Sequence, residues 1–272
     1  MVDTKQIGGP TTEPQDELAG SEAPLLEHLI ELRKRLIYSA VTIVALMAFC
    51  FIFASTIYDW LLIPYKGAVP GADLIFTAPQ ELFFTYLNVA LFGAIFLGFP
   101  VIASQIYMFV APGLYKHERK AFVPYLIATP LFFVAGAALV YFVVLPMALH
   151  FFAGMQTEDI KLMSRVSEYL GFAMILILAF GVCFQLPVIL TLLAQIDLVH
   201  VDMLKKGRRY AIVGILIFAA FITPPDPISQ IGLALPMYAL YELSIISVRM
   251  IEKRRAQALA KQEAELSGAS SE

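Results

Sequence analysis

Long hydrophobic runs alternate with short polar segments along most of this chain. Six runs contain between them a single Asp, Glu, Lys or Arg, Glu242, and they cover residues 36–57, 86–108, 123–151, 169–196, 210–222 and 228–248. A helix rises about 1.5 Å per residue, so about 20 apolar residues cross the roughly 30 Å hydrocarbon core of a bilayer. A segment in lipid must also satisfy its own backbone hydrogen bonds, which favours helices. The pattern therefore predicts an all-α integral membrane protein with six transmembrane helices.

The basic residues predict how these helices are oriented. All 19 Lys and Arg precede the first run or follow the second, fourth or sixth, except Lys66, Lys161 and Arg165. Basic residues accumulate in the cytoplasmic segments of membrane proteins. We therefore predict that both termini lie in the cytoplasm.

Interior prolines predict that several of the helices are bent. Each proline removes one helical hydrogen bond, and four of the six runs contain at least one: Pro100, Pro130, Pro146, Pro187 and Pro236. Bends in so many helices predict a curved body with a concave side. The run at 210–222 is too short for the hydrocarbon core, so it must thin the bilayer, draw in flanking groups such as Arg208 and Arg209, or be covered by partners.

Composition limits the remaining classes of protein. An apolar content of 59% excludes an ordinary soluble domain. Residues 1–20 are polar and are expected to be a disordered cytoplasmic tail without a removable signal peptide, residues 21–255 a single membrane domain, and residues 256–272 a second cytoplasmic tail. The two cysteines lie inside helices and provide neither a disulfide nor a metal framework. With no catalytic motif, we expect no enzyme activity, no metal and no cofactor.

Two segments outside the hydrophobic runs carry candidate recognition residues. Residues 25–36 have helical periodicity with one leucine stripe, formed by Leu25, Leu29, Leu32 and Leu36. Glu31 projects from the opposite face, whereas Arg33 projects from the apolar side. One interpretation is an interfacial helix whose arginine reaches lipid phosphate; the other is a cytoplasmic site that Arg33 organises, with Glu31 facing a cationic partner.

The segment after the second run contains another candidate carboxylate. Glu118 is the sole acid among Lys116, Arg119 and Lys120, and Phe109 lies at the membrane edge. At an exposed position Glu118 would merely neutralise its neighbours. Together with Glu31, it would form half of a two-carboxylate receptor at the membrane surface.

Three segments, 25–36, 109–120 and 223–230, closely resemble the TatC family, the six-helix receptor of the twin-arginine protein translocase. The resemblance implies that Glu31 and Glu118 bind the paired arginines of signal peptides, with Leu25 part of the same surface. It also implies functional weight for Arg33, Pro64, Phe109, Asp226 and Gln230. The chemistry fits independently, because arginine offers a planar fork of donors that a carboxylate accepts in bidentate fashion, whereas lysine offers a point charge. Phe109 suits the apolar residues that follow the arginine pair.

The resemblance further implies partners and location. The implied partners are single-span TatA-like and TatB-like proteins, further copies of this chain and folded precursor proteins, but no nucleic acid. The implied location is a bacterial inner membrane, across which the proton-motive force moves the precursors. We expect Thr223, Asp226 and Gln230, beside the short fifth helix, to form a polar docking patch for a partner helix. The competing interpretation is that Thr223 and Asp226 only cap a turn.

Two further positions, one inside a hydrophobic run and one between two runs, are candidates for a role. Gln185 lies mid-helix, where many relatives carry Glu, so we expect it to supply a hydrogen-bonding group rather than a charge. Pro64 lies in the segment 58–85, whose aromatic and proline content predicts a short structured cap near the membrane surface.

Two other function classes compete with the receptor. A secondary transporter of a small solute would need charged midplane residues and repeats, and the midplane offers only Gln185. An intramembrane enzyme would need a nucleophile–base pair or a metal constellation, which the sequence lacks. We therefore predict a receptor and scaffold that acts by binding.

Overall fold

The computed structural model describes residues 15–69, 74–110, 123–157, 162–222 and 227–269. This part of the chain is almost entirely helical, and its only β pairing is an isolated bridge between Ile75 and Arg165. The all-α prediction is confirmed. Along the chain the elements are α1 (Gln15–Ile52), α2 (Ala54–Ala68), α3 (Glu81–Val110), α4 (Val123–Leu139), η3 (Val140–Val144), α5 (Leu145–Ala153), α6 (Val166–Cys183), α7 (Leu186–Gln195), α8 (Val201–Ile222) and α9 (Pro227–Ala269).

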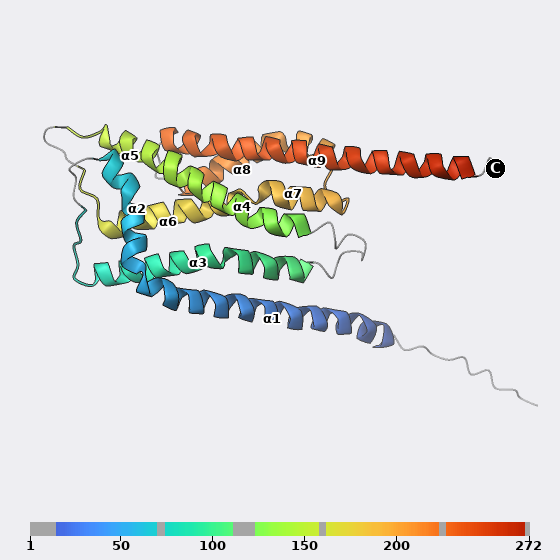
Figure 1. Cartoon of the computed structure of the whole chain (residues 1–272), viewed down its shortest axis with the longest axis horizontal. Coiled ribbons are helices and arrows are strands. Elements are labelled where there is room, and N and C mark those ends of the chain that lie inside the picture. Colours follow the sequence, from blue (N-terminus) through green and yellow to red (C-terminus); the bar gives the residue numbers. More distant parts are fainter. Residues whose placement is uncertain (1–14, 70–73, 111–122, 158–161, 223–226, 270–272) are drawn as a thin grey trace, which may run out of the picture.

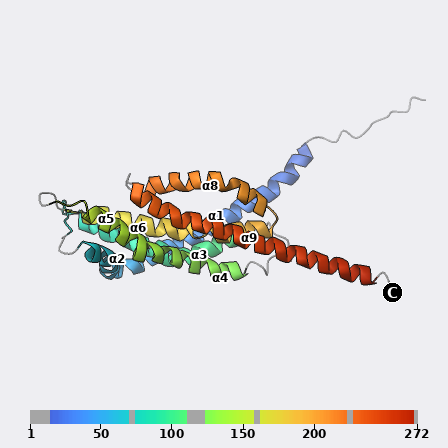
Figure 2. The same cartoon turned by 90° about the horizontal axis from the view of Figure 1, so that it is seen from above.

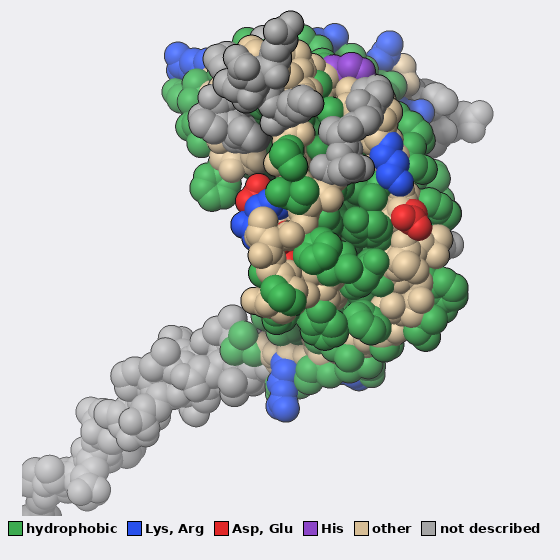
Figure 3. Space-filling view, turned by 90° about the vertical axis from the view of Figure 1, so that its left-hand side faces the viewer, with side chains coloured by type: hydrophobic (Ala, Val, Ile, Leu, Met, Phe, Trp, Pro, Cys, Tyr) green, Lys and Arg blue, Asp and Glu red, His purple; other side chains and the backbone are tan. Residues whose placement is uncertain are grey.

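The long helices run side by side along one direction, and α2 crosses them at one end (Figure 1). We call this end the cap end. The first residues of α1 and the last residues of α9 lie at the opposite end in both views (Figures 1 and 2), which we call the basic end. Seen from the cap end, the surface shows many hydrophobic side chains and only scattered charged ones (Figure 3).

Five described helical segments are long and apolar enough to cross a membrane: His28–Ile52, Glu81–Phe109, Tyr125–Ala153, Val166–Gln195 and Gln230–Gln257. Helix α8 does not meet this standard, because its first nine residues include Asp202 and four basic residues. The sequence interpretation of a short fifth helix is corrected here. Its 210–222 run is the apolar half of a 22-residue helix, which Lys and Arg, good helix formers, extend.

The N-terminal boundary also differs from the expectation. Helix α1 begins at Gln15, so residues 15–20, expected to be disordered, are helical, and residues 25–36 belong to the same helix rather than to a separate interfacial one. Residues 17–19 (Glu-Leu-Ala) are strong helix formers that can continue a helix already nucleated by a membrane span. The helix ends at Ile52 instead of residue 57, and after Phe53 the chain turns into α2.

Two of the predicted prolines coincide with changes in helix geometry. Pro146 follows the π-helical segment η3 and cannot donate to the carbonyl of Phe142 inside it. Pro187 opens α7 directly after the break at Phe184 and Gln185 that separates α6 from α7. The other prolines lie within continuous helices, at Pro100, Pro130 and Pro236.

Close packing holds α4 against α6. A Cβ added to Gly136 would lie 2.6 Å from the carbonyl oxygen of Phe180, and one added to Gly181 would lie 2.5 Å from the ring of Phe133. Small residues of this kind let helix backbones approach each other in lipid. On another side, an apolar groove of about 690 Å³ opens between α2, α3 and α4, lined among others by Trp60, Phe96 and Val134. The bundle is hollowed along this groove.

Candidate functional site

A polar cluster joins α1 to α3 at the basic end. The carboxylate of Glu31 accepts a hydrogen bond from Arg35 at 3.2 Å through its Oε1 atom. The Arg35 guanidinium also reaches α3, where it donates to Oε1 of Gln105 at 3.3 Å and contacts the sulfur of Met108. Both charged side chains are partly exposed, at 30% for Glu31 and 26% for Arg35. Arg35 therefore fixes the position of Glu31 relative to the end of α3.

The predicted Phe109 lies beside this cluster. Its ring stacks on the ring of His28, with 4.3 Å between centroids and 22° between planes. The structure thus brings Glu31 and Phe109 to the same junction, because α1 and α3 pack along each other. A carboxylate with an aromatic surface next to it can hold a cation and the apolar residues that follow it.

This cluster keeps binding capacity that the described residues do not use. No hydrogen bond to the second carboxylate oxygen of Glu31 is found among them, and the Nε–H of Arg35 is buried without a partner in that same part of the chain. A buried donor without a partner costs free energy. A ligand with both acceptor and donor groups could satisfy both atoms.

The other predicted recognition residues are placed as follows. Arg33 is exposed on α1, and no hydrogen bond or ion pair joins it to another side chain in the described ranges. Leu25 lies within α1, but its side chain is outside the described part, and Glu118 lies in the segment 111–122, also outside the described residues. Leu29, Leu32 and Leu36 are exposed, at 59%, 43% and 67%. The leucine stripe therefore faces outward, while the polar face with Glu31 packs on α3.

Sequence reasoning missed Arg35, His28 and Gln105. The pair Glu31 and Arg35 has the i, i+4 spacing of a helical ion pair, with Glu on the N-terminal side, so this signal was available. The partners on α3 were not, because the register between α1 and α3 is set by their packing. Among the described residues no group of three or more His, Cys, Asp or Glu side chains forms a metal site.

Pro64 has a clear structural role in the cap helix. Because proline has no N–H, the carbonyl of Trp60, four residues earlier in α2, receives no helical hydrogen bond. The hydroxyl of Tyr141 donates to this oxygen at 2.7 Å. Next to it, the hydroxyl of Tyr169 donates to the carbonyl of Leu61 at 2.8 Å. Helix α2 lies within the region predicted to form a cap, and two tyrosines tie it to η3 and α6; its position near a membrane surface stays a prediction.

Gln185 is buried at the break between α6 and α7. Its Nε2 atom donates to the carbonyl of Thr129 on α4 at 3.1 Å and to the carbonyl of Gly181 at 3.2 Å. The hydroxyl of Thr129 in turn pairs with the hydroxyl of Tyr107 on α3 at 2.6 Å. Within the described part, Oε1 of Gln185 has no partner. The site uses the amide as a donor between helices.

At the predicted docking patch the structure describes only Gln230. Its Nε2 atom donates to the carbonyl of Leu216 at 3.1 Å, which joins the start of α9 to α8. Thr223 and Asp226 lie outside the described residues. Farther along, Glu242 of α9 pairs with Arg208 of α8 at 2.7 Å and accepts a hydrogen bond from Tyr238 at 2.9 Å.

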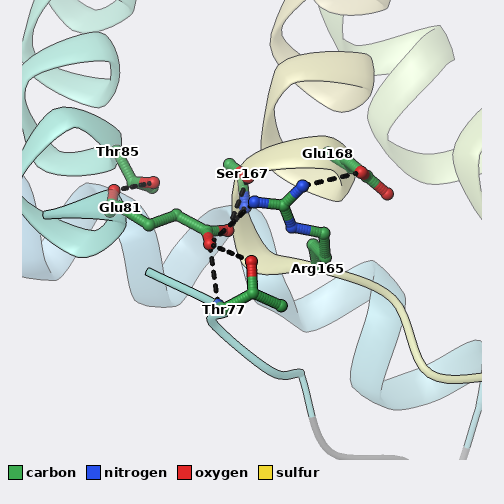
Figure 4. Close-up of polar contacts among 6 residues, drawn as sticks. All are labelled: Thr77, Glu81, Thr85, Arg165, Ser167 and Glu168. Atoms are coloured by element: carbon green, nitrogen blue, oxygen red, sulfur yellow. Dashed lines mark hydrogen bonds and ion pairs between the residues drawn. The ribbon is translucent and has the colours of Figure 1, made fainter. Parts of the chain in front are cut away.

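A second polar cluster lies at the cap end, around Glu81 (Figure 4). Glu81 is 8% exposed, and its carboxylate accepts from the backbone N–H of Thr77 at 2.9 Å and from the hydroxyl of Ser167 at 2.6 Å. Arg165 donates to the same carboxylate at 3.1 Å and also contacts the exposed Glu168 at 3.5 Å. The β-bridge between Ile75 and Arg165 is adjacent. Glu81 therefore connects the segment before α3 to the start of α6.

The signal for this cluster was present only in part. Glu81 opens α3 and its partner Thr77 is only four residues earlier, so this contact is local, and acidic residues are favoured in the first turn of a helix. Arg165 and Ser167 are more than 80 residues away, and only the fold brings them to Glu81. The sequence predicted a cap over residues 58–85 but assigned no contact between that segment and Arg165 or Ser167.

The five long apolar helical segments and the polar clusters at both ends are those of a multi-pass α-helical membrane protein. Residues 27–236 match the family model of the Sec-independent protein translocase protein (TatC), and the chain belongs to the TatC family. As a TatC protein, it is a component of the Sec-independent protein translocase.

The relatives cover most of the chain. The TatC protein of Magnetococcus marinus is 42% identical over 90% of this chain and 90% of its own length. The TatC protein of Escherichia coli strain K12 is 38% identical over 83% of this chain and 88% of its own. A crystal structure described as the twin arginine translocase receptor TatC aligns with a TM-score of 0.76 at 33% identity, covering 83% of this chain and 99% of that one.

Proposed function

We propose that this protein is the signal-peptide receptor of its translocase, and that Glu31 binds one arginine of a twin-arginine signal. The observation that carries this is the cluster at the basic end. Arg35 holds the Glu31 carboxylate on α3, and one carboxylate oxygen is without a partner in the described residues. Phe109, stacked on His28, offers an aromatic surface beside it.

Glu31 alone does not supply enough negative charge for two arginines. Arg35 already compensates its charge, and Arg33 and Lys34 are exposed on the same helix. A second carboxylate is therefore required, and Glu118 on the segment after α3 is the acid we assign to it. Arg33 and Leu25 would line the approach on α1, as the family resemblance implies. The site acts by binding, with no covalent chemistry.

The binding test uses the full-length protein in lipid nanodiscs with a synthetic twin-arginine signal peptide. Glu31→Gln and Glu118→Ala should each weaken binding about tenfold or more, the usual cost of removing one partner of a charge-assisted pair. Asp202→Asn is the matched control, because Asp202 is an exposed acid on α8 that only approaches Lys205 at 3.9 Å. A Lys-Lys peptide should bind weakly to every variant. Equal affinity of Glu31→Gln and the unchanged protein for the Arg-Arg peptide would contradict the proposal.

We further propose that both termini lie in the cytoplasm of a bacterial inner membrane and that α8 completes a set of six spans. Of the 19 Lys and Arg residues, 16 lie in the segments that would then face the cytoplasm, and only Lys66, Lys161 and Arg165 do not, which supports this orientation. A cysteine introduced at the exposed Gln257 should not react with a membrane-impermeant reagent in intact cells. It should react once the cells are permeabilised and the reagent reaches the cytoplasm. Labelling of intact cells at this position would reverse the orientation.

Helices α8 and α9 are the surface we propose for TatA-like and TatB-like partners, with further copies of this chain in the complex. Helix α8 packs mainly on α9, and its outer face exposes Val213, Ile217 and Phe221, the last at 92%. Thr223 and Asp226 follow α8 in the sequence, and Gln230 lies near the start of α9. A cysteine at Ile217 should crosslink to a partner helix, whereas one at Leu131 on α4, equally exposed, should not. Crosslinks from Leu131 alone would move the docking surface away from α8.

A further inference from the structure

A basic pocket lies between α4, α7 and α9 at the basic end, apart from the cluster around Glu31. It has a volume of about 390 Å³ and is lined by Tyr125, Gln195, Ile251, Arg254 and Arg255. The last three are spaced i, i+3 and i+4 along α9, so they share one helix face. Two guanidinium groups therefore converge on a phenol and an amide from two other helices.

Some polar groups of this pocket are hydrogen-bonded or paired with other described residues, and others are not. The hydroxyl of Tyr125 donates to Oε1 of Gln195 at 3.1 Å, which leaves the amide N–H groups of Gln195 as donors. Arg255 pairs with Asp197 at 2.8 Å. Arg254 has no ion pair or hydrogen bond within the described ranges, so its charge is the uncompensated one.

The surroundings indicate what kind of anion fits. Arg254 lies three residues before the end of the apolar segment Gln230–Gln257, and Tyr125 is the first residue of the apolar segment Tyr125–Ala153. On α4, Leu126 and Ile127 follow Tyr125 and are exposed, at 40% and 63%, so an apolar surface of this helix begins next to the pocket. A soluble anion would use only the pocket, whereas a phospholipid would use both the pocket and this surface.

We propose that this pocket binds the phosphate of an anionic phospholipid, with Arg254 as the principal donor and the acyl chains along α4. Arginine matches a phosphate in bidentate fashion, and basic pockets between membrane helices on the cytoplasmic side are suited to anionic headgroups. The site is independent of the proposed signal-peptide site, since the two share no residue.

The test uses the full-length protein in detergent and measures lipid binding by native mass spectrometry. The probes are dioctanoyl phosphatidylglycerol, dioctanoyl phosphatidylcholine and inorganic phosphate. Phosphatidylglycerol should bind in preference to phosphatidylcholine, and Arg254→Gln should weaken its binding about tenfold. Arg254→Lys keeps the charge but not the planar fork of donors, so its affinity for phosphatidylglycerol should lie between those of the unchanged protein and Arg254→Gln. Lys253→Gln, the neighbouring exposed charge that does not line the pocket, should stay within about twofold of the unchanged protein.

Three outcomes would overturn the proposal. An equal loss in Arg254→Gln and Lys253→Gln would show only general surface charge. Equal binding of phosphatidylglycerol and phosphatidylcholine would show that the pocket does not distinguish headgroups by their charge. Displacement of phosphatidylglycerol by millimolar inorganic phosphate would assign the pocket to a soluble phosphate instead of a lipid. Because Arg254 is exposed and unpaired in the described structure, its substitution leaves the fold intact, and a normal thermal transition of the variant confirms this.

Discussion

The two ends of the bundle each contain a partly buried glutamate, but they use it differently. At the cap end, Glu81 accepts hydrogen bonds from Thr77, Ser167 and Arg165 and is 8% exposed. At the basic end, Glu31 has one ion pair, to Arg35, and its side chain is 30% exposed. The first carboxylate is saturated by its own chain, whereas the second keeps an oxygen that no described residue occupies.

The difference separates a site that holds the fold from a site that binds. Apolar burial does not drive helices together in lipid, so polar contacts and close packing must order the bundle. The cap end has such contacts between segments far apart in sequence, through Glu81, Tyr141 and Tyr169. The basic end leaves Arg33 and Arg254 exposed and without partners among the described residues. Substitutions at the cap end should therefore reduce stability, and those at the basic end should reduce binding.

The largest effect on stability is expected at Glu81. Glu81→Ala removes an acceptor of several hydrogen bonds, one from a charged donor, and should lower the free energy of unfolding by about 2–3 kcal/mol. Glu168→Ala is the control, since this acid contacts the same Arg165 but is 66% exposed, and its loss should cost less than about 0.5 kcal/mol. Unfolding in mixed micelles with increasing dodecyl sulfate measures both. Similar values for the two variants would remove the distinction between the ends.

A smaller effect is expected where Tyr141 ties the cap to the membrane helices. Tyr141→Phe should cost about 1 kcal/mol, the value of one hydrogen bond, whereas Tyr38→Phe, at an exposed position on α1, should cost nothing measurable. Pro64→Ala restores an N–H that competes for the carbonyl of Trp60. In that background the Tyr141→Phe substitution should cost less, and a double-mutant cycle measures the coupling. Strict additivity would show that Pro64 does not free this carbonyl.

Between the two ends, Gln185→Leu should cost about 0.6 kcal/mol, the average for a polar contact between membrane helices. The geometry sharpens the sequence prediction, because both observed bonds use the amide as donor. Glu at this position can donate only when protonated, so Gln185→Glu should recover the stability of the original protein as the pH is lowered. A Leu variant as stable and as active in transport as the original would show that the polarity is incidental.

The smallest effect on stability is expected at Glu31. Glu31→Gln should change the free energy of unfolding by less than about 0.5 kcal/mol, as for other partly exposed ion pairs, even though it weakens signal-peptide binding. Measuring unfolding and binding on the same preparation separates the two effects. A loss of more than 1 kcal/mol would place Glu31 with the residues that hold the fold.

Part of the candidate site could be predicted from the sequence, and part of it could not. Glu31, Phe109 and Pro64 were named from sequence, and the structure places the first two at one junction. Sequence reasoning missed Arg35, although its spacing from Glu31 is typical of a helical ion pair, because periodicity was used to find apolar faces and not polar pairs. It also missed Glu81, whose partners Arg165 and Ser167 are distant in the sequence. The length of α8 was misjudged because hydrophobicity marks the part of a helix in lipid, not where the helix ends.

The sequence by itself determined the all-helical class, the apolar segments and the family, since a bilayer imposes its thickness on any spanning helix and tolerates few charges. Only the tertiary structure decided which polar atoms meet. The carbonyl of Trp60 is freed by Pro64 within one helix, but Tyr141 reaches it from 81 residues away. Arg165 finds Glu81 across 84 residues. Such pairs depend on the register and crossing of helices, which small residues such as Gly136 and Gly181 set through packing, and that register has no local signature in the chain.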